Sequence, residues 1–337
     1  MSQPNIAFST LAQQDDLSLS NLLSLNLWYD IDHSSLVADK EAQTPTYVLL
    51  FGFQLGMQVA NLAQQLQLWP GQVSAVCRFE AHSDLPPAFV FSVHGEAAEL
   101  AQQLKQYGAD NGVQCAVLVN PPKLSEPGLL VMDMDSTAIT IECIDEIARL
   151  GGVYDEVAAV TAQAMAGKLE FSASLRQRVA KLEGIPLKLV AELQNQLPLM
   201  PGIEQVCEVL REHKWHLAIA SGGFVPFAAH VQQLLNLDRI HANTLDDDGE
   251  VLVGTVSGKI VDADEKARFL CAYRDELGLA KAQTLAIGDG ANDLLMLHQA
   301  GLGVAVHGKA KVVAEAPAAI TAGSLAQLLY FLTIPAR

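Results

Sequence analysis

Cysteine, basic residues and long apolar runs are all scarce in this chain of 337 residues, and each scarcity excludes a class of protein. The five cysteines never form a Cys-x-x-Cys pair, which argues against a zinc site or a disulfide framework and favours free thiols in a reducing compartment. Lysine and arginine number 21 against 38 acidic residues, and the formal charge is -17. Nucleic acids and anionic membranes prefer basic surfaces, so neither is expected as a partner.

No apolar run is long enough to span a membrane, and the amino terminus has no basic stretch followed by an apolar core. We therefore expect a soluble, cytoplasmic protein. Half of the residues are hydrophobic and 18% are charged, which is an ordinary globular composition with few charges. A chain of this length can bury a substantial core, in one to three domains.

The amino-terminal third predicts a small α+β domain over residues 44–122. Residues 1–43 are polar and weakly periodic, and we leave them unassigned as an arm that is mobile in part. Strands and helical stripes then alternate in the order β-α-β-β-α-β, at residues 47–52, 59–66, 73–79, 88–93, 96–107 and 113–119. This order is typical of a ferredoxin-like sandwich. It resembles ACT-type modules, which bind amino acids or pair subunits, so a homodimer through this domain is one expectation and a purely structural role is another.

A proline-rich linker at residues 121–128 leads into a second domain, which we place at residues 128–337. Its first strand, residues 129–132, is wholly apolar and ends at Asp133 and Asp135. Two carboxylates this close repel each other unless a cation joins them, and Mg²⁺ is the simplest such ion. The alternative is an Asp-rich turn that caps a helix.

The rest of this domain predicts a doubly wound, mostly parallel sheet of the Rossmann type. Residues 141–184 are almost wholly helical in pattern, and we expect a helical cap over about residues 141–200 that covers the site. Further strands are expected at residues 215–220, 284–287, 302–306 and 320–321, with a hairpin at residues 240–256. Residues 221–223, Ser-Gly-Gly, are expected to open a helix.

Three predicted strand ends carry polar groups: residues 133–135, residues 221–223 and residues 289–293. Because the carboxyl ends of parallel strands lie at one edge of a sheet, we expect these groups to meet there. A phosphate group needs hydroxyl and backbone N–H donors, a cation and a metal ion. Ser221, the neighbouring glycines, Lys266 and the aspartates could supply these.

The same motifs, in the same order, resemble those of the haloacid dehalogenase-like phosphohydrolases. They are Asp-x-Asp-Ser-Thr at residue 133, Ser-Gly-Gly at residue 221, Lys266, and Gly-Asp-Gly-x-Asn-Asp at residue 288. Within that superfamily the bacterial phosphoserine phosphatases are most similar, because residues 141–148, 174–179, 197–202 and 219–224 also resemble theirs. The resemblance covers about residues 129–325.

By this resemblance Asp133 is the nucleophile that forms an aspartyl-phosphate, and Asp135 is the general acid and then the general base. One Mg²⁺ would be held by the Asp133 carboxylate, the Asp135 backbone carbonyl and the Asp289 carboxylate, with Asp293 orienting them. The second acid favours a phosphatase over relatives that dehalogenate or pump ions.

The resemblance also assigns the residues that would bind substrate. Phosphoryl oxygens would be held by Ser221, Gly222 and Lys266, with Asn292 beside them. In the cap, Glu142 would bind a substrate ammonium and Arg178 its carboxylate, for which a planar guanidinium is well suited.

We therefore predict a Mg²⁺-dependent phosphatase that hydrolyses O-phospho-L-serine to L-serine and phosphate, the last step of serine biosynthesis. A related phosphatase acting on another small phosphomonoester is the first alternative. The second, from another class, is a phosphate-accepting or amino-acid-binding regulator, since receiver domains also combine a doubly wound sheet with acidic residues, a hydroxyl and a lysine. Receiver domains are much shorter and lack a helical insert and a second catalytic acid.

Overall fold

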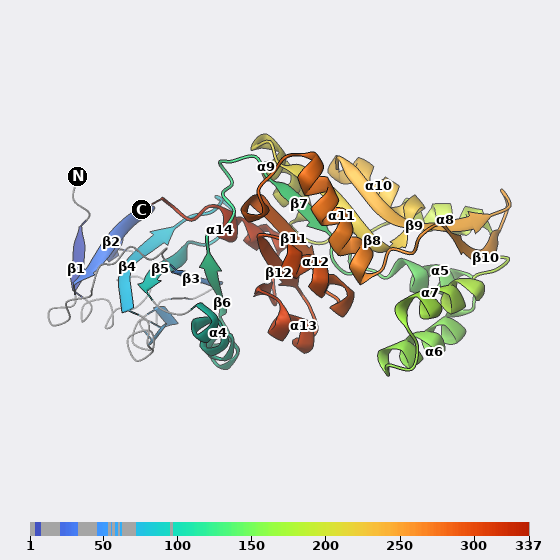
Figure 1. Ribbon diagram of the computed structural model, residues 1–337, viewed down its shortest axis with the longest axis horizontal. Coiled ribbons are helices and arrows are strands. Elements are labelled where there is room, and N and C mark those ends of the chain that lie inside the picture. Colours follow the sequence, from blue (N-terminus) through green and yellow to red (C-terminus); the bar gives the residue numbers. More distant parts are fainter. Residues whose placement is uncertain are drawn as a thin grey trace. The chain divides into compact units, whose positions relative to one another are not determined.

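The computed structural model describes residues 4–7, 21–32, 46–52, 55, 58–59, 61–62, 72–94 and 97–336. The chain divides into two compact units (Figure 1), each of which is described by itself. The amino-terminal unit comprises residues 1–124, 318–321 and 326–337, and the second unit comprises residues 125–317 and 322–325. We expected residues 128–337 to form one domain, whereas the last residues of the chain group with the amino-terminal unit.

The amino-terminal unit is built on a sheet with the strand order β1-β2-β4-β5-β3-β6. Its elements are β1 (Asn5–Ala7), β2 (Leu27–Asp32), β3 (Thr46–Phe51), β4 (Gln72–Phe79), β5 (Ala88–His94), α4 (Ala97–Asn111) and β6 (Gln114–Val119). All neighbours from β2 to β6 in this order pair antiparallel. The arrangement β4-β5-β3-β6 is the strand order of a ferredoxin-like sandwich, so the predicted α+β fold is confirmed. Most of the predicted helix at residues 59–66 lies outside the described residues.

Residues 1–43, which the sequence left unassigned, contribute two strands to this sheet. Strand β2 pairs antiparallel with β4, and β1 pairs parallel with β2. Trp28 and Ile31 are the buried residues of β2, at 2% and 7% exposure. Because they are three positions apart, β2 lacks the period of two that identifies a half-buried strand in a sequence.

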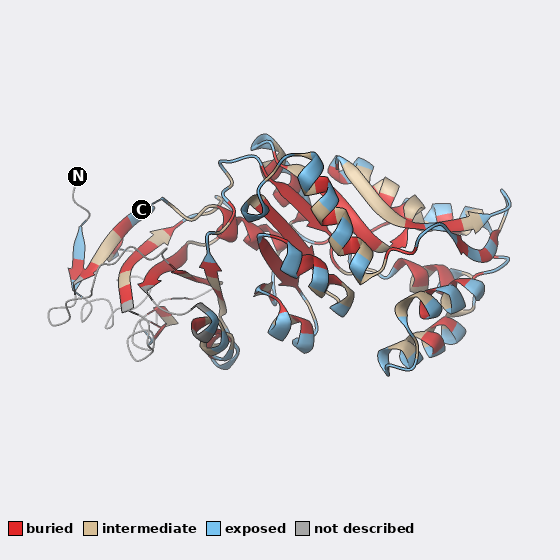
Figure 2. Cartoon of the chain, in the orientation of Figure 1, coloured by how far each residue is buried: buried red, intermediate tan, exposed pale blue. Residues whose placement is uncertain are grey.

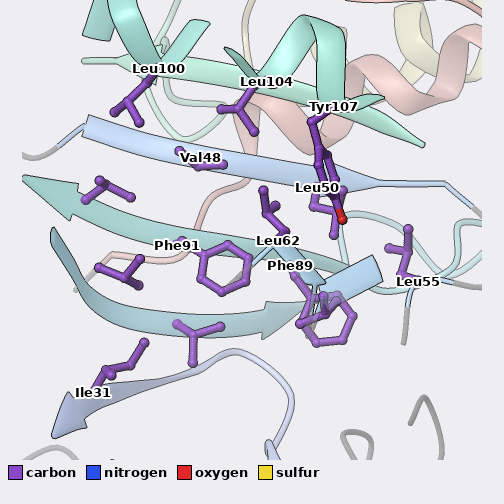
Figure 3. Packing of buried hydrophobic residues seen from close by; sticks show 14 of the residues in the cluster. Ile31, Val48, Leu50, Leu55, Leu62, Phe89, Phe91, Leu100, Leu104 and Tyr107 are labelled. Atoms are coloured by element: carbon purple, nitrogen blue, oxygen red, sulfur yellow. The ribbon is translucent and has the colours of Figure 1, made fainter. Parts of the chain in front are cut away.

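Helix α4 forms the hydrophobic core of this unit together with the sheet (Figure 3). Leu100, Leu104 and Tyr107 are spaced by four and three residues, which places them on one face of the helix. Val48 and Leu50 on β3 alternate along the strand, so both point toward that face. The helical spacing on α4 and the alternation on β3 therefore bring the apolar side chains of both elements into one core.

The carboxyl-terminal segment belongs to this unit through helix α14 (Leu329–Leu332), in which every residue is buried. The Tyr330 ring lies 5.3 Å from the ring of Phe51 and 6.2 Å from that of Phe79, measured between centroids. Its hydroxyl donates to the carbonyl oxygen of Pro86. Four apolar residues near a chain end predict no particular partner, so the sequence did not reveal this packing.

In the second unit the strands follow the order β10-β9-β8-β7-β11-β12. Their bounds are β7 (Leu129–Met132), β8 (His216–Phe224), β9 (Arg239–Asp247), β10 (Leu252–Ser257), β11 (Thr284–Gly288) and β12 (Leu302–Val306). All neighbours pair parallel except β9 and β10, which form the predicted antiparallel hairpin. Every residue of β7, β11 and β12 is buried (Figure 2), as expected where helices cover both faces of a parallel sheet. The predicted doubly wound fold is confirmed.

Helices α9 (Ile203–Glu212), α10 (Val225–Leu235), α11 (Ala263–Glu276), α12 (Leu294–Gln299) and α13 (Ala310–Glu315) accompany these strands. The prediction that residues 221–223 open a helix was wrong, because β8 continues through them to Phe224. Helix α10 begins at Val225, with Pro226 in its first turn. Proline is suited to that turn because the backbone N–H that it lacks would have no partner within the helix.

The predicted helical insert consists of α5 (Cys143–Leu150), α6 (Tyr154–Met165), α7 (Phe171–Ala180) and α8 (Leu187–Gln194). Helices α5, α6 and α7 pack together, and α7 also contacts β10 (Figure 1). None of the described helices combines the length and the apolar character that crossing a membrane requires.

The packing of Tyr330 yields a test of the carboxyl-terminal segment. We expect Tyr330→Ala to lower the free energy of unfolding by about 3–5 kcal/mol, because it removes a fully buried ring. Tyr330→Phe keeps the ring and removes only the hydrogen bond, so it should cost about 1 kcal/mol. Denaturant unfolding followed by fluorescence measures both. An unchanged midpoint for Tyr330→Ala would show that α14 does not stabilise this unit.

Candidate active site

The site begins where β7 ends. The backbone N–H of Asp133 donates to the carbonyl oxygen of Ile287 at 3.0 Å, which extends the pairing of β7 with β11 by one residue. The Asp133 side chain is buried, as is that of Met134. Asp133 and Asp135 both line a cavity of about 590 Å³, whereas Met134 does not. Two carboxylates one residue apart thus reach the cavity from the segment that directly follows β7.

A completely buried lysine fixes the Asp133 carboxylate. The Nζ of Lys266 lies 2.8 Å from Asp133 Oδ1 and 2.7 Å from Asp293 Oδ1. Burial alone would lower the pKa of Lys266, but the charges of Asp133 and Asp293 raise it above its ordinary value. Lys266 therefore stays charged and joins two acidic groups from the ends of β7 and β11.

The start of helix α11 sets the position of Lys266. The Asp262 side chain caps this helix by accepting a hydrogen bond from the Glu265 backbone N–H at 2.9 Å. Lys266 follows in the first turn, and its own N–H donates to the Asp262 carbonyl oxygen at 2.9 Å. An N-cap four residues earlier thus directs the lysine inward.

Asp289 completes an acidic cluster with Asp133 and Asp293, and one carboxylate oxygen of each lies within 4.8 Å of the others. Burial, reinforced by the charges of Asp133 and Asp293, raises the pKa of Asp289 to about 7. Asp293 directs both of its oxygens to other partners, Lys266 Nζ and the Gly290 N–H. Asp289 and Asp133 therefore have oxygens available for a cation, and Thr137 Oγ1 donates to Asp289 at 3.3 Å.

Asp135 is in a different environment from Asp133. Burial raises its pKa well above the ordinary value, and the charges of Glu142 and Asp133 raise it further. Its Oδ1 is buried and has no hydrogen-bond partner among the described residues. These conditions favour the protonated carboxylic acid, which can donate a proton.

Residues 221–223 belong to β8, at an irregularity in its pairing with β9. Ser221 is fully buried, and its Oγ accepts a hydrogen bond from the Gly223 N–H at 2.9 Å. The hydroxyl hydrogen thus remains available to an acceptor in the cavity, which Ser221 lines. A Cβ on Gly223 would lie 3.1 Å from Asp135 Oδ2, so glycine here keeps space beside the acid.

Asn243 supports this part of β8 and was not identified from the sequence. Its side-chain nitrogen donates to the Gly222 carbonyl oxygen at 2.8 Å, and its oxygen accepts from the Val261 N–H at 2.9 Å. It therefore links the end of β8 to the segment that enters α11. The only signal in the sequence was a polar residue inside a strand, which does not indicate its two partners.

Two charged residues of the helical insert also line the cavity, Glu142 and Arg178. Glu142 accepts a hydrogen bond from Ser136 Oγ at 2.7 Å, and burial raises its pKa. Burial lowers the pKa of Arg178, which Asp145 and Glu142 partly oppose. The helical insert thus contributes one acidic and one basic side chain to the cavity lining.

Most of the predicted site residues line the cavity, and one, Lys266, does not. Those that line it are Asp133, Asp135, Glu142, Arg178, Ser221, Gly222, Asp289 and Asn292. Lys266 does not line it but lies behind Asp133, with no exposed surface. Met165 and Phe171 line the cavity as well, and Met165 is 68% exposed.

Comparison with known proteins gives matches over the same part of the chain. A family model described as haloacid dehalogenase-like hydrolase matches residues 128–301. A curated phosphoserine phosphatase of Haemophilus influenzae is 47% identical over 224 residues, which are 66% of this chain and 71% of that protein.

Two solved structures are also similar. The structure of a probable phosphoserine phosphatase from Vibrio cholerae covers 88% of each chain with a TM-score of 0.69 and 35% identity. A structure described as a phospho-aspartyl intermediate analogue of phosphoserine phosphatase has a TM-score of 0.58 and 34% identity, over 62% of this chain and all of that one. With this fold, these strand-end motifs and a match over more than half its length, the chain belongs to the haloacid dehalogenase-like hydrolases.

Proposed function

We propose that this hydrolase is a phosphoserine phosphatase, which converts O-phospho-L-serine and water to L-serine and phosphate. The observation that carries the proposal is the pairing of two unlike carboxylates in one cavity with Glu142 and Arg178. Lys266 holds Asp133 by a direct ion pair, whereas Asp135 is buried and forms no ion pair with the residues that the structure describes. The relatives named phosphoserine phosphatase support the choice of substrate.

In the first step an Asp133 carboxylate oxygen attacks phosphorus, and the bond from phosphorus to the serine oxygen breaks. The Asp135 carboxylic acid gives its proton to the departing oxygen, which would otherwise leave as a poor alkoxide. An aspartyl-phosphate on Asp133 and free serine result. Ser221 Oγ–H and the backbone N–H of Gly222 stabilise the phosphoryl oxygens as charge shifts.

In the second step water attacks the phosphorus of the aspartyl-phosphate. Asp135, now a carboxylate, accepts a proton from this water, and the Asp133 carboxylate leaves. Phosphate is released, and both aspartates return to their starting protonation states. Lys266 keeps Asp133 aligned through both steps because its contact does not depend on substrate.

A divalent cation fits the acidic cluster. Lys266 forms ion pairs with Asp133 and Asp293, and Asp289 adds a third carboxylate to the cluster. Oxygen ligands of this kind suit Mg²⁺. Asp133, Asp289 and the Asp135 backbone carbonyl would hold it, and Asp293, occupied by Lys266 and Gly290, would orient the cluster. When bound, Mg²⁺ would neutralise phosphoryl charge as a Lewis acid.

The nucleophile can be tested by Asp133→Asn. An amide does not form the acyl-phosphate, so phosphate release from phosphoserine should fall by about 10³-fold or more. Asp155→Asn, at an exposed position of α6, is the matched control and should retain wild-type activity. Phosphate release is measured by a colorimetric assay. Substantial activity in Asp133→Asn would reject this mechanism.

The metal can be tested by removal and titration. A chelator should abolish phosphate release, and added Mg²⁺ should restore it. Asp289→Asn removes one charged ligand, so we expect half-maximal activation to need roughly tenfold more Mg²⁺ or higher. The titration is followed by activity and by calorimetry. Full activity in excess chelator would contradict a metal-dependent reaction.

Substrate recognition can be tested at Arg178. If its guanidinium binds the substrate carboxylate, Arg178→Ala should lower kcat/KM for phosphoserine by roughly 10²- to 10³-fold. Phosphoethanolamine lacks that carboxylate, so its slower hydrolysis should change little. An Arg178→Ala enzyme that keeps its preference for phosphoserine would reject Arg178 as the residue that binds the substrate carboxylate.

A further inference from the structure

Helix α7 presents to the cavity a buried hydroxyl that has no partner. Ser174 lines the cavity and is 1% exposed, and its Oγ makes no hydrogen bond to any described residue. A serine hydroxyl inside a helix can bond to the carbonyl four residues earlier. Here that oxygen, of Glu170, accepts from the Ser174 backbone N–H at 2.9 Å, and the hydroxyl is left over.

Arg178 lies one helical turn beyond Ser174 on the same helix. Residues four apart occupy one face of a helix, and both of these line the cavity. The Nε of Arg178 is also buried without a partner among the described residues. Two buried donors therefore lie side by side at one cavity wall.

Leaving buried donors unpaired costs free energy, and an acceptor supplied by a ligand recovers it. A carboxylate has two oxygens with about four acceptor sites, so it can receive hydrogen bonds from a guanidinium and a hydroxyl together. The phosphoryl group would lie at Ser221 and Asp133, on other elements of the cavity. The second anionic group of the substrate is thus the acceptor that suits α7.

We propose that Ser174 determines specificity by donating its Oγ–H to the substrate carboxylate that Arg178 binds. The inference rests on the proposed phosphoserine phosphatase activity and adds a residue to which neither the motifs nor the comparisons give a role. Ser174 and Arg178 together form a carboxylate clamp on α7. Substrates without a carboxylate gain nothing from it.

The test compares Ser174→Ala on two substrates. We expect kcat/KM for phosphoserine to fall roughly ten- to hundredfold, as for the loss of a hydrogen bond to a charged group. Hydrolysis of phosphoethanolamine should be unchanged. Ser172→Ala is the matched control, because Ser172 lies on the same helix and does not line the cavity, and it should alter neither substrate.

Thermal unfolding separates this role from a structural one. Removing an unpartnered buried hydroxyl should leave the Tm of Ser174→Ala unchanged or raise it. An equal loss of activity on both substrates, no loss on phosphoserine, or a lowered Tm would each overturn the proposal. A wild-type enzyme that releases no phosphate from phosphoserine would instead reject the proposed function itself, before any variant is compared.

Discussion

One buried ion-pair network, Lys266 with Asp133 and Asp293, is the interaction on which the rest of the site depends. It joins groups from β7, from α11 and from the turn after β11, which are up to 160 positions apart in the chain. Removing one partner of a buried ion pair costs about 3–5 kcal/mol, because the other charge is left without compensation. The network therefore holds the nucleophile in position and keeps β7, α11 and the turn after β11 together.

The same network explains how two nearby aspartates have different roles. Lys266 forms an ion pair with Asp133, whereas Asp135 has no ion pair within the described part of the chain and lies near Glu142. Burial favours the carboxylic acid at Asp135, whereas the Asp133 carboxylate is in contact with a cation. A nucleophile and a proton donor thus differ by environment, while their residue type is the same.

The gathering of strand ends could be predicted from the sequence, because parallel strands end at one edge of a sheet. This rule placed Asp133, Ser221 and Asp289 together, and all three line the cavity. Positions that depend on a tertiary partner could not be predicted. Asn243 supports the site through hydrogen bonds to the backbone of Gly222 and Val261. Ser174 stands out because its buried hydroxyl has no hydrogen-bond partner among the described residues.

In the amino-terminal unit, too, elements with a local pattern could be predicted and elements that depend on distant partners could not. The order of its strands and helices along the chain, which is typical of a ferredoxin-like fold, followed from apolar patterns that depend on local periodicity. Strand β2 has no such period because Trp28 and Ile31 are three positions apart, and α14 is too short to have one. Both elements are stabilised by contacts with residues far away in the chain.

The most direct test of the account is whether a phosphoryl group is transferred to Asp133. The enzyme would be quenched with acid during turnover of phosphoserine, and its peptides analysed by mass spectrometry. The account predicts one phosphoryl group on the peptide that contains Asp133, located on that residue and absent from Asp133→Asn. Continued turnover with no phosphoryl group on Asp133, or with one on another residue, would contradict it.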